Sequence, residues 1–172
     1  MRLHKGEVLF RQGESGPLFR VEQGLLKVVR IHEDGSQFIF NIITPGEVIP
    51  HHSLITPKEY HGTAIALTTC EVSIIPASEW YAELEQTADN YRRAASLLQS
   101  KLRMMQQRID QLTAIEPRER LQRLEQWFRS YITDIPFTEL LTQEEIGQFL
   151  GLRRETVNRL LRARAAKDDA KG

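Results

Sequence analysis

The sequence predicts an α+β protein in which a sandwich or barrel of short strands is followed by helices. Residues 1–77 alternate short apolar runs with turn-forming residues, a pattern that favours many short antiparallel strands. Residues 78–161 instead carry apolar side chains at helical spacing. Gly151 interrupts the last helical stretch and predicts two short helices joined by a tight turn.

The strand-like region has clear turn signals between its apolar runs. Asp34 and Gly35 separate two runs, and this dipeptide predicts a β-hairpin. We expect a first domain over residues 1–88, a long helix over residues 89–113 and a last domain over residues 114–172. The expected strands lie at residues 8–10, 18–21, 25–31, 38–40, 42–43, 64–67 and 72–75.

The long helix carries an apolar seam whose spacing alternates between four and three, as in a heptad repeat. Ser78 is expected to cap a shorter helix before it, around Trp80 and Leu84. The seam could pack on the chain's own strand domain, or it could form a parallel coiled coil between two copies. Its members are Tyr91, Ala95, Leu98, Leu102, Met105, Ile109 and Leu112.

The last domain begins with a helix from Pro117 to about Tyr131, because proline suits the first helical turn. A helix-turn-helix is expected at residues 141–161. Thr142 is placed to cap its first helix, and Glu145 completes a capping box. The expected buried positions of the motif are Ile146, Leu150, Val157, Leu160 and Leu161.

The second helix of this motif keeps a polar face. In a helix-turn-helix this helix enters the DNA major groove, where arginine can pair with guanine and glutamate can accept from cytosine. The motif predicts sequence-specific reading of double-stranded DNA; the alternative is an ordinary helical hairpin with a solvated charged face. The polar face comprises Arg154, Glu155, Asn158, Arg159 and Arg162.

The composition limits the remaining function classes. The formal net charge is zero, so any DNA affinity must come from a local basic face. The sequence has no apolar run of membrane-spanning length and no signal peptide, which favours a cytoplasmic protein with no membrane partner. Cys70 is the single cysteine, excludes an internal disulfide and is expected as a small buried side chain. The basic residues near the C-terminus are Arg153, Arg154, Arg159, Arg162, Arg164 and Lys167.

The motif at residues 142–159 resembles the signature of the cyclic-AMP receptor protein/Fnr (Crp/Fnr) family of bacterial transcription regulators. Residues 5–47 are likewise similar to the double-stranded β-roll, or jelly roll, of cyclic-nucleotide-binding domains. The resemblance implies a homodimer held by the long helix, a palindromic operator and RNA polymerase as a further partner. It implies that Arg154, Glu155 and Arg159 read bases. The other DNA-contacting positions it suggests are Thr142, Gln143, Arg153, Thr156 and Asn158.

The sequence departs from this family at the cyclic-AMP pocket. Aligned by eye, His51 replaces the glutamate, His61 the arginine and Gly62 the serine that hold the nucleotide. We therefore expect no cyclic AMP, and Cys70 alone cannot hold an Fnr-type iron–sulfur cluster. An anionic small molecule, no ligand at all, and a metal or haem at His51 and His61 remain as alternatives, with no cofactor expected. The candidate effector-pocket residues are His51, His52, His61, Gly62 and Thr63.

The two ends of the chain also depart from the family pattern. No strand pattern follows Arg162, so the family's β-hairpin wing is expected to be absent, and residues 167–172 are expected to fray. The family's leading helix is not seen before the first strand either. The alternative function is a ligand-sensing or interaction module with weak DNA binding. Catalysis is not expected, because the pocket histidines have no paired carboxylates or nucleophile motif beside them.

Overall fold

The computed structural model describes the backbone of residues 1–169 and the side chains of residues 1–166. The chain divides into two compact units, Met1–Gln106 and Gln107–Gly172, and each is considered by itself. Helix α2 (Ala88–Thr113) contributes residues to both. No helix in the described part of the chain is long and apolar enough to cross a membrane.

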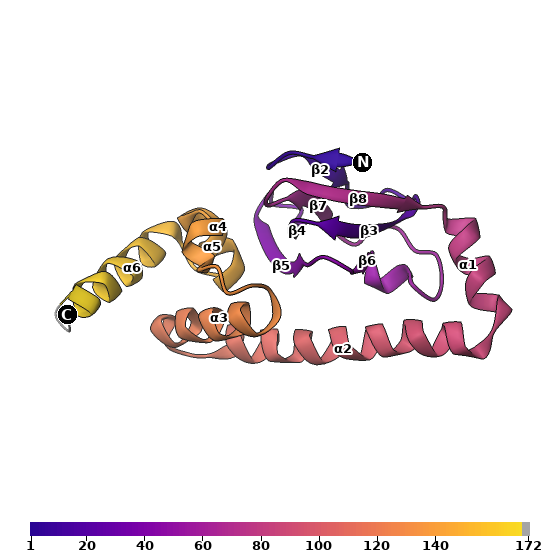
Figure 1. Ribbon diagram of the computed structural model, residues 1–172. Helices are drawn as coiled ribbons and strands as arrows, with labels where there is room; N and C mark the ends of the chain where they lie inside the picture. Colours follow the sequence, from indigo (N-terminus) through magenta and orange to yellow (C-terminus); the bar gives the residue numbers. More distant parts are fainter. Residues whose placement is uncertain (170–172) are drawn as a thin grey trace. The chain divides into compact units, whose positions relative to one another are not determined.

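The first unit is a β-roll of two antiparallel four-stranded sheets (Figure 1). One sheet has the order β1-β8-β3-β6 and the other the order β2-β7-β4-β5, so strands distant in sequence lie side by side. This confirms the expected α+β class with its N-terminal β-roll. The strands are β1 (Arg2–Leu3), β2 (Val8–Phe10), β3 (Leu18–Gln23), β4 (Leu26–Ile31), β5 (Gln37–Ile43), β6 (Val48–Ile49), β7 (Thr63–Ala66) and β8 (Cys70–Ile75).

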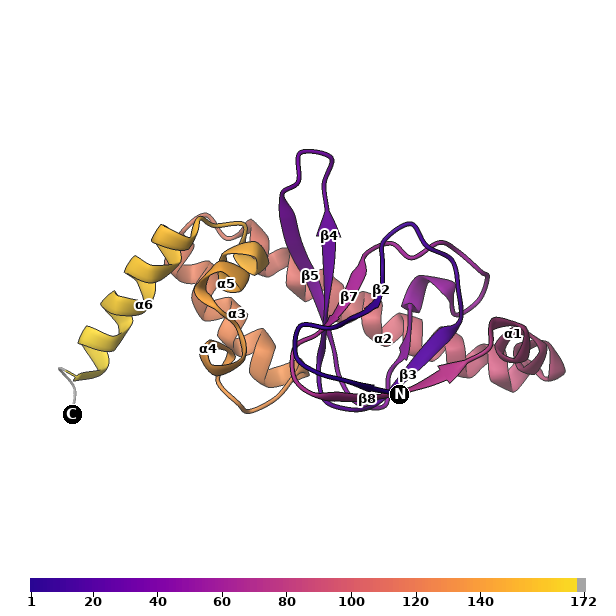
Figure 2. The same ribbon diagram turned by 90° about the horizontal axis from the view of Figure 1, so that it is seen from above.

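Strands β4 and β5 form the hairpin that Asp34 and Gly35 predict. Their pairing extends from Leu26 opposite Ile43 to Ile31 opposite Gln37, and Figure 2 shows the tip projecting beyond the other strands. Gly35 has a φ of 79°, a backbone conformation that glycine adopts without steric strain and other residues rarely adopt. The Asp34 carboxylate accepts hydrogen bonds from Ser36 and closes the turn.

The core of the β-roll lies between the two sheets. Phe10 stacks on Phe19 with ring centroids 5.6 Å apart, and the ring centroids of Tyr60 and Phe10 are 4.1 Å apart. The Tyr60 hydroxyl donates to the carbonyl of Pro17, so its polar end is satisfied. Cys70 is fully buried, as expected, and burial raises the pKa of its thiol.

Two helical segments follow the strands of the first unit. The short helix η1 (His51–Ser53) follows β6, and helix α1 (Ala77–Gln86) follows β8. The expectation that Ser78 caps α1 is wrong, because the helix begins at Ala77 with Pro76 before it and no side-chain cap. Proline presets the backbone for the helix entry, so Ser78 falls within the first turn. The indole of Trp80 donates to the carbonyl of Leu54 and joins α1 to the loop after η1.

The second unit is helical. Pro117 begins α3, as expected, and the helix buries Leu121, Leu124, Trp127 and Phe128. Helix α4 has no counterpart in the sequence-based expectations, and its Phe137 packs against Phe128. Residues 167–169 belong to α6, so fraying from residue 167 is not observed there, and residues 170–172 lie outside the described part. The helices are α3 (Pro117–Tyr131), α4 (Phe137–Leu140), α5 (Gln143–Leu150) and α6 (Arg154–Asp169).

Candidate DNA-binding and effector sites

The helix-turn-helix is formed by α5 and α6. The Thr142 hydroxyl accepts from the Glu145 N–H at 3.2 Å, and the Glu145 carboxylate accepts from the Thr142 N–H at 2.7 Å. This is the capping box that the sequence predicts. Gly151 ends α5 in the left-handed region, with φ of 64° and ψ of 37°, also as expected.

A second glycine of the motif has a role that spacing alone did not reveal. The Gly147 carbonyl accepts from the Leu152 N–H at 2.9 Å, which draws the turn against α5. A Cβ on Gly147 would lie 2.5 Å from the Leu152 carbonyl oxygen, closer than Cβ atoms approach backbone. The close approach of the turn therefore requires glycine at this position.

The buried side of the motif holds α6 in place. Ile146, Leu150 and Val157 are buried as expected, whereas Leu160 and Leu161 are only half-buried. Phe149 is also buried, with its ring centroid 5.5 Å from that of Trp127. The two helices are thus fixed against α3, and the polar face of α6 has a rigid support.

Arg108 is an unexpected part of this core. It lies on α2 and is only 1% exposed. Its guanidinium lies 3.9 Å over the Phe149 ring and donates to the Phe149 carbonyl and to the Gln111 carboxamide. Burial lowers the pKa of Arg108 to about 9, so it stays charged at neutral pH.

The outer face of the motif carries most of the expected DNA-contacting side chains. A shallow recess of about 300 Å³ is lined by Arg154, Glu155 and Asn158. Asn158, Thr156 and Gln143 are half-buried. The exposed members are Thr142, Arg153, Arg154, Glu155, Arg159 and Arg162.

Two expected members of the basic face are not placed on it. Arg164 donates to the Glu125 carboxylate of α3 at 2.8 Å, because ten residues after Arg154 the helix has turned toward α3. The side chain of Lys167 lies outside the described side chains. The exposed basic character is therefore concentrated in the first turns of α6.

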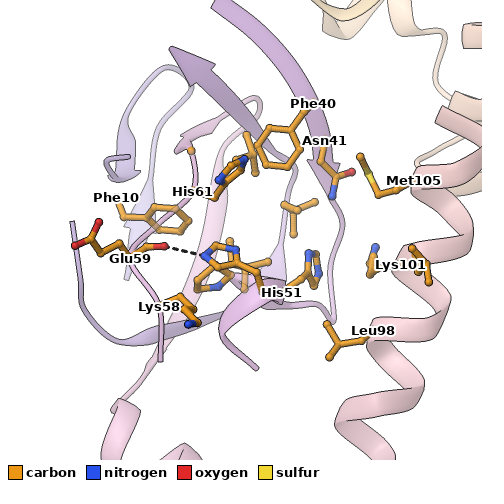
Figure 3. A pocket seen from close by; sticks show the side chains of 17 residues that line it. Phe10, Phe40, Asn41, His51, Lys58, Glu59, His61, Leu98, Lys101 and Met105 are labelled. Carbon is orange, nitrogen blue, oxygen red and sulfur yellow. Dashed lines mark hydrogen bonds between the residues drawn. The ribbon is translucent and has the colours of Figure 1, made fainter. Parts of the chain in front are cut away.

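The β-roll holds a cavity of about 790 Å³, open on one side and walled in part by α2 (Figure 3). Four of the five expected effector-pocket residues line it. Thr63 does not, because its buried hydroxyl accepts from the Gln12 N–H at 3.1 Å. The lining histidines and glycine are His51, His52, His61 and Gly62, and the α2 residues are Leu98, Lys101, Leu102 and Met105.

The three histidines are not arranged as one cluster. His52 and His61 are neighbours, with ring centroids 6.1 Å apart, and His52 Nε2 lies 2.9 Å from the Glu59 carbonyl. His51 instead lies 2.9 Å from the Glu47 carboxylate. Burial, with the Arg30 charge and His52, lowers the pKa of His61, so this imidazole is neutral at neutral pH.

Glu47 appeared in the sequence only as part of a turn, but it is central here. Its carboxylate pairs with Lys101 of α2 at 2.7 Å as well as with His51. Burial alone would raise the pKa of Glu47, but the His51 hydrogen bond and the Lys101 charge outweigh it and lower the pKa to about 2. The acid is therefore ionised and internally neutralised. Among the described residues no group of three or more His, Cys, Asp or Glu side chains could hold a metal.

The seam of α2 is divided between two environments. Leu98, Met105 and Leu112 are half-buried; Leu98 and Met105 line the cavity, as does one edge of the more exposed Leu102. The other members are exposed, among them Leu102 at 61% and Ile109 at 56%. The exposed members are Tyr91, Ala95, Leu102 and Ile109. An apolar stripe thus remains uncovered in the single chain.

Both the β-roll and the helix-turn-helix match known protein families. Residues 1–87 match the family described as cyclic nucleotide-binding domain, and residues 140–163 match bacterial regulatory proteins, crp family. The transcriptional activator protein anr of Pseudomonas aeruginosa is 33% identical over 164 residues, 92% of this chain and 67% of that protein. The cyclic AMP receptor protein of Thermus thermophilus is 27% identical over 163 residues, 94% of this chain and 74% of that protein.

Solved structures show the same fold. A CRP-family transcriptional regulator from Thermus thermophilus superposes with a TM-score of 0.80 at 23% identity, over 98% of this chain and 85% of that one. FixK2 from Bradyrhizobium japonicum has a TM-score of 0.81 at 21% identity, over 98% and 84% of the two chains. The Pseudomonas protein is named as a transcriptional activator, and the first Thermus structure as a transcriptional regulator. With a domain match across residues 1–87 and 33% identity over most of its length to one such regulator, the chain belongs to the Crp/Fnr family of bacterial transcription regulators.

Proposed function

We propose that this protein is a dimeric, sequence-specific DNA-binding transcription regulator that reads its operator with α6. The observation that carries the proposal is the exposed polar face of α6 on a capped and packed helix-turn-helix. Arg154 and Arg159 are suited to guanine, and Glu155 to cytosine or to orienting an arginine. Asn158 lines the same recess as Arg154 and would add a base contact.

The remaining residues of the face would position the protein on the phosphate backbone. Thr142, Gln143, Arg153 and Thr156 surround the start of the two helices. Contacts of this kind fix register without carrying sequence information. Their loss should weaken binding to all sequences alike.

The exposed stripe of α2 supports the dimer. Leu102 and Ile109 are seven residues apart, the heptad interval that aligns side chains along a coiled-coil seam. A second copy of α2 would cover them and hold two α6 helices for a palindromic operator.

The cavity is the proposed effector site, and cyclic AMP is not its ligand. The positions expected to hold the phosphate and ribose are occupied by His61, Gly62 and His51. His51 is already engaged by Glu47. Because α2 forms one wall, an occupant would touch the proposed dimer helix directly.

Fluorescence anisotropy against palindromic and scrambled duplexes, with a salt titration, tests the DNA proposal. Arg159→Ala should weaken binding to the preferred palindrome by roughly 1–3 kcal/mol and affect scrambled DNA less. Arg164→Ala is the matched control on the same helix, since Arg164 is paired with Glu125. Equal loss on both duplexes would contradict base reading by Arg159. Absence of selective binding would instead favour a sensing or interaction module.

A further inference from the structure

The walls of the β-roll cavity are predominantly apolar. Aromatic and aliphatic side chains come from both sheets and from α2, and Figure 3 shows Phe10, Phe40, Leu98 and Met105 around the space. At about 790 Å³ the cavity falls in the size range of sites for small organic ligands. Such walls favour an occupant whose surface is largely hydrocarbon or aromatic.

The shielded charges of the cavity lining compensate one another. The Lys101 ammonium is held at 2.7 Å by the Glu47 carboxylate, which also engages His51. Lys58 and Glu59 also line the cavity, but both are exposed, so their charges stay in contact with solvent. No arginine lines the cavity in the described part of the chain. A charged group that enters the apolar interior would lose its hydration there without gaining a shielded, unpaired counter-charge.

Neutral hydrogen-bonding groups do face the cavity. Asn41 is 3% exposed, and its carboxamide oxygen accepts from the Ile42 N–H at 2.9 Å. Its amide nitrogen is turned toward the cavity (Figure 3), where it can donate to an occupant. The neighbouring pair His52 and His61 adds ring nitrogens to the lining that can donate or accept hydrogen bonds.

We propose that the cavity binds an uncharged, mostly apolar small molecule carrying one hydroxyl or carbonyl group, anchored by the Asn41 amide. This rests on the proposed effector role of the cavity and narrows the chemical class of its ligand. The class excludes cyclic nucleotides and fatty carboxylates, whose charge has no shielded, unpaired partner in the lining.

Two matched pairs of probes test the class on the purified full chain, without DNA. Phenylnaphthylamine is an uncharged fluorophore, and anilinonaphthalene sulfonate adds a negative charge to the same skeleton. The uncharged probe should bind about tenfold more tightly or better, because the sulfonate must be desolvated unpaired. Decanol should displace it, decanoate should do so at least about tenfold less well, and cyclic AMP should not.

Variants locate the binding. Met105→Trp should fill the cavity and reduce probe affinity by about tenfold or more, because Met105 is a half-buried part of the wall. Leu97→Trp is the matched control on the same helix, since Leu97 is exposed and does not line the cavity. Asn41→Leu should weaken the binding of decanol by roughly threefold to tenfold, which is the effect of losing one hydrogen bond. The affinity for phenylnaphthylamine should not change.

Each result bears on the inference. Tighter binding of the sulfonate, displacement by decanoate or cyclic AMP, or absence of probe binding in the folded protein would overturn it. Equal loss of probe affinity in Met105→Trp and Leu97→Trp would also contradict it, because the probe would then bind elsewhere. Direct probe binding reports the ligand class, whereas the anisotropy assay reports DNA reading, so the two proposals can fail separately.

Discussion

Glu47 and Lys101 form a 2.7 Å ion pair between the turn before β6 and the helix α2. The side chains are 11% and 21% exposed, so the pair is largely shielded from water. Breaking such a shielded pair destabilises a protein more than breaking a surface pair, because the remaining charge is left uncompensated.

Removing either charge of this pair should destabilise the β-roll. We expect Lys101→Met to lower the free energy of unfolding by about 2–3 kcal/mol, because Glu47 would keep only His51 as a partner. Urea denaturation followed by circular dichroism measures the change. Arg93→Met is the matched control: Arg93 pairs with Asp89 on the same helix, but both side chains are well exposed. Arg93→Met should lower the free energy of unfolding by less than about 0.5 kcal/mol. Equal decreases in the two variants would show that the Glu47–Lys101 pair stabilises the protein no more than a surface pair does.

The stability of the protein should fall in acid because of Glu47. Its pKa is lowered in the folded state to about 2 from an ordinary value of 4.5. The stabilisation is therefore fully present above about pH 4.5 and is lost as the pH falls toward about 2. Glu47→Gln lacks the stabilisation that ionised Glu47 provides. The urea midpoints of the wild-type protein and of this variant should therefore converge as the pH falls from about 5 to about 3. A constant difference across that range would show that Glu47 has an ordinary pKa.

Gly147 and Gly151 should respond differently to alanine. Gly151→Ala places a Cβ in open space but at a φ of 64°, which should cost about 1 kcal/mol. Gly147→Ala would bring a Cβ within 2.5 Å of the Leu152 carbonyl oxygen. Since the backbone must move to relieve that contact, we expect a larger loss of stability there. Thermal unfolding of both variants ranks them, and the reverse order would contradict the role given to Gly147.

Local features of the fold were predictable because they depend on residues close together in sequence. The β4–β5 hairpin followed from Asp34 and Gly35, and the capping box from Thr142 and Glu145. Pro117 likewise marked the start of α3. Each of these signals is confined to a few neighbouring positions, where backbone preference decides the outcome.

The contacts that define the two sites were less accessible to sequence reasoning. The sequence suggested His51 as the neighbour of His61, but in the structure His52 lies beside His61 and His51 pairs with Glu47. Arg108 gave no local sign that its guanidinium is buried over Phe149, forty-one residues later. Such pairings depend on how separate elements pack, which spacing within one helix does not report.

The dimer proposal predicts that the exposed seam of α2 is sensitive to charge. Ile109→Asp should convert a dimer to a monomer, because each copy would place a carboxylate in the proposed coiled-coil interface. Sedimentation velocity of the full chain, with circular dichroism to confirm folding, measures the change.

Ile74→Asp is the matched control for this variant. Ile74 on β8 is 55% exposed and Ile109 is 56% exposed, so the two substitutions remove similar amounts of exposed apolar surface. Only Ile109 lies on α2, and only its replacement should dissociate the dimer. Dissociation by Ile74→Asp with an intact dimer in Ile109→Asp would assign the interface to the β-roll instead. A wild-type chain that sediments as a monomer would exclude the α2 coiled coil, because the exposed stripe would then be uncovered in solution.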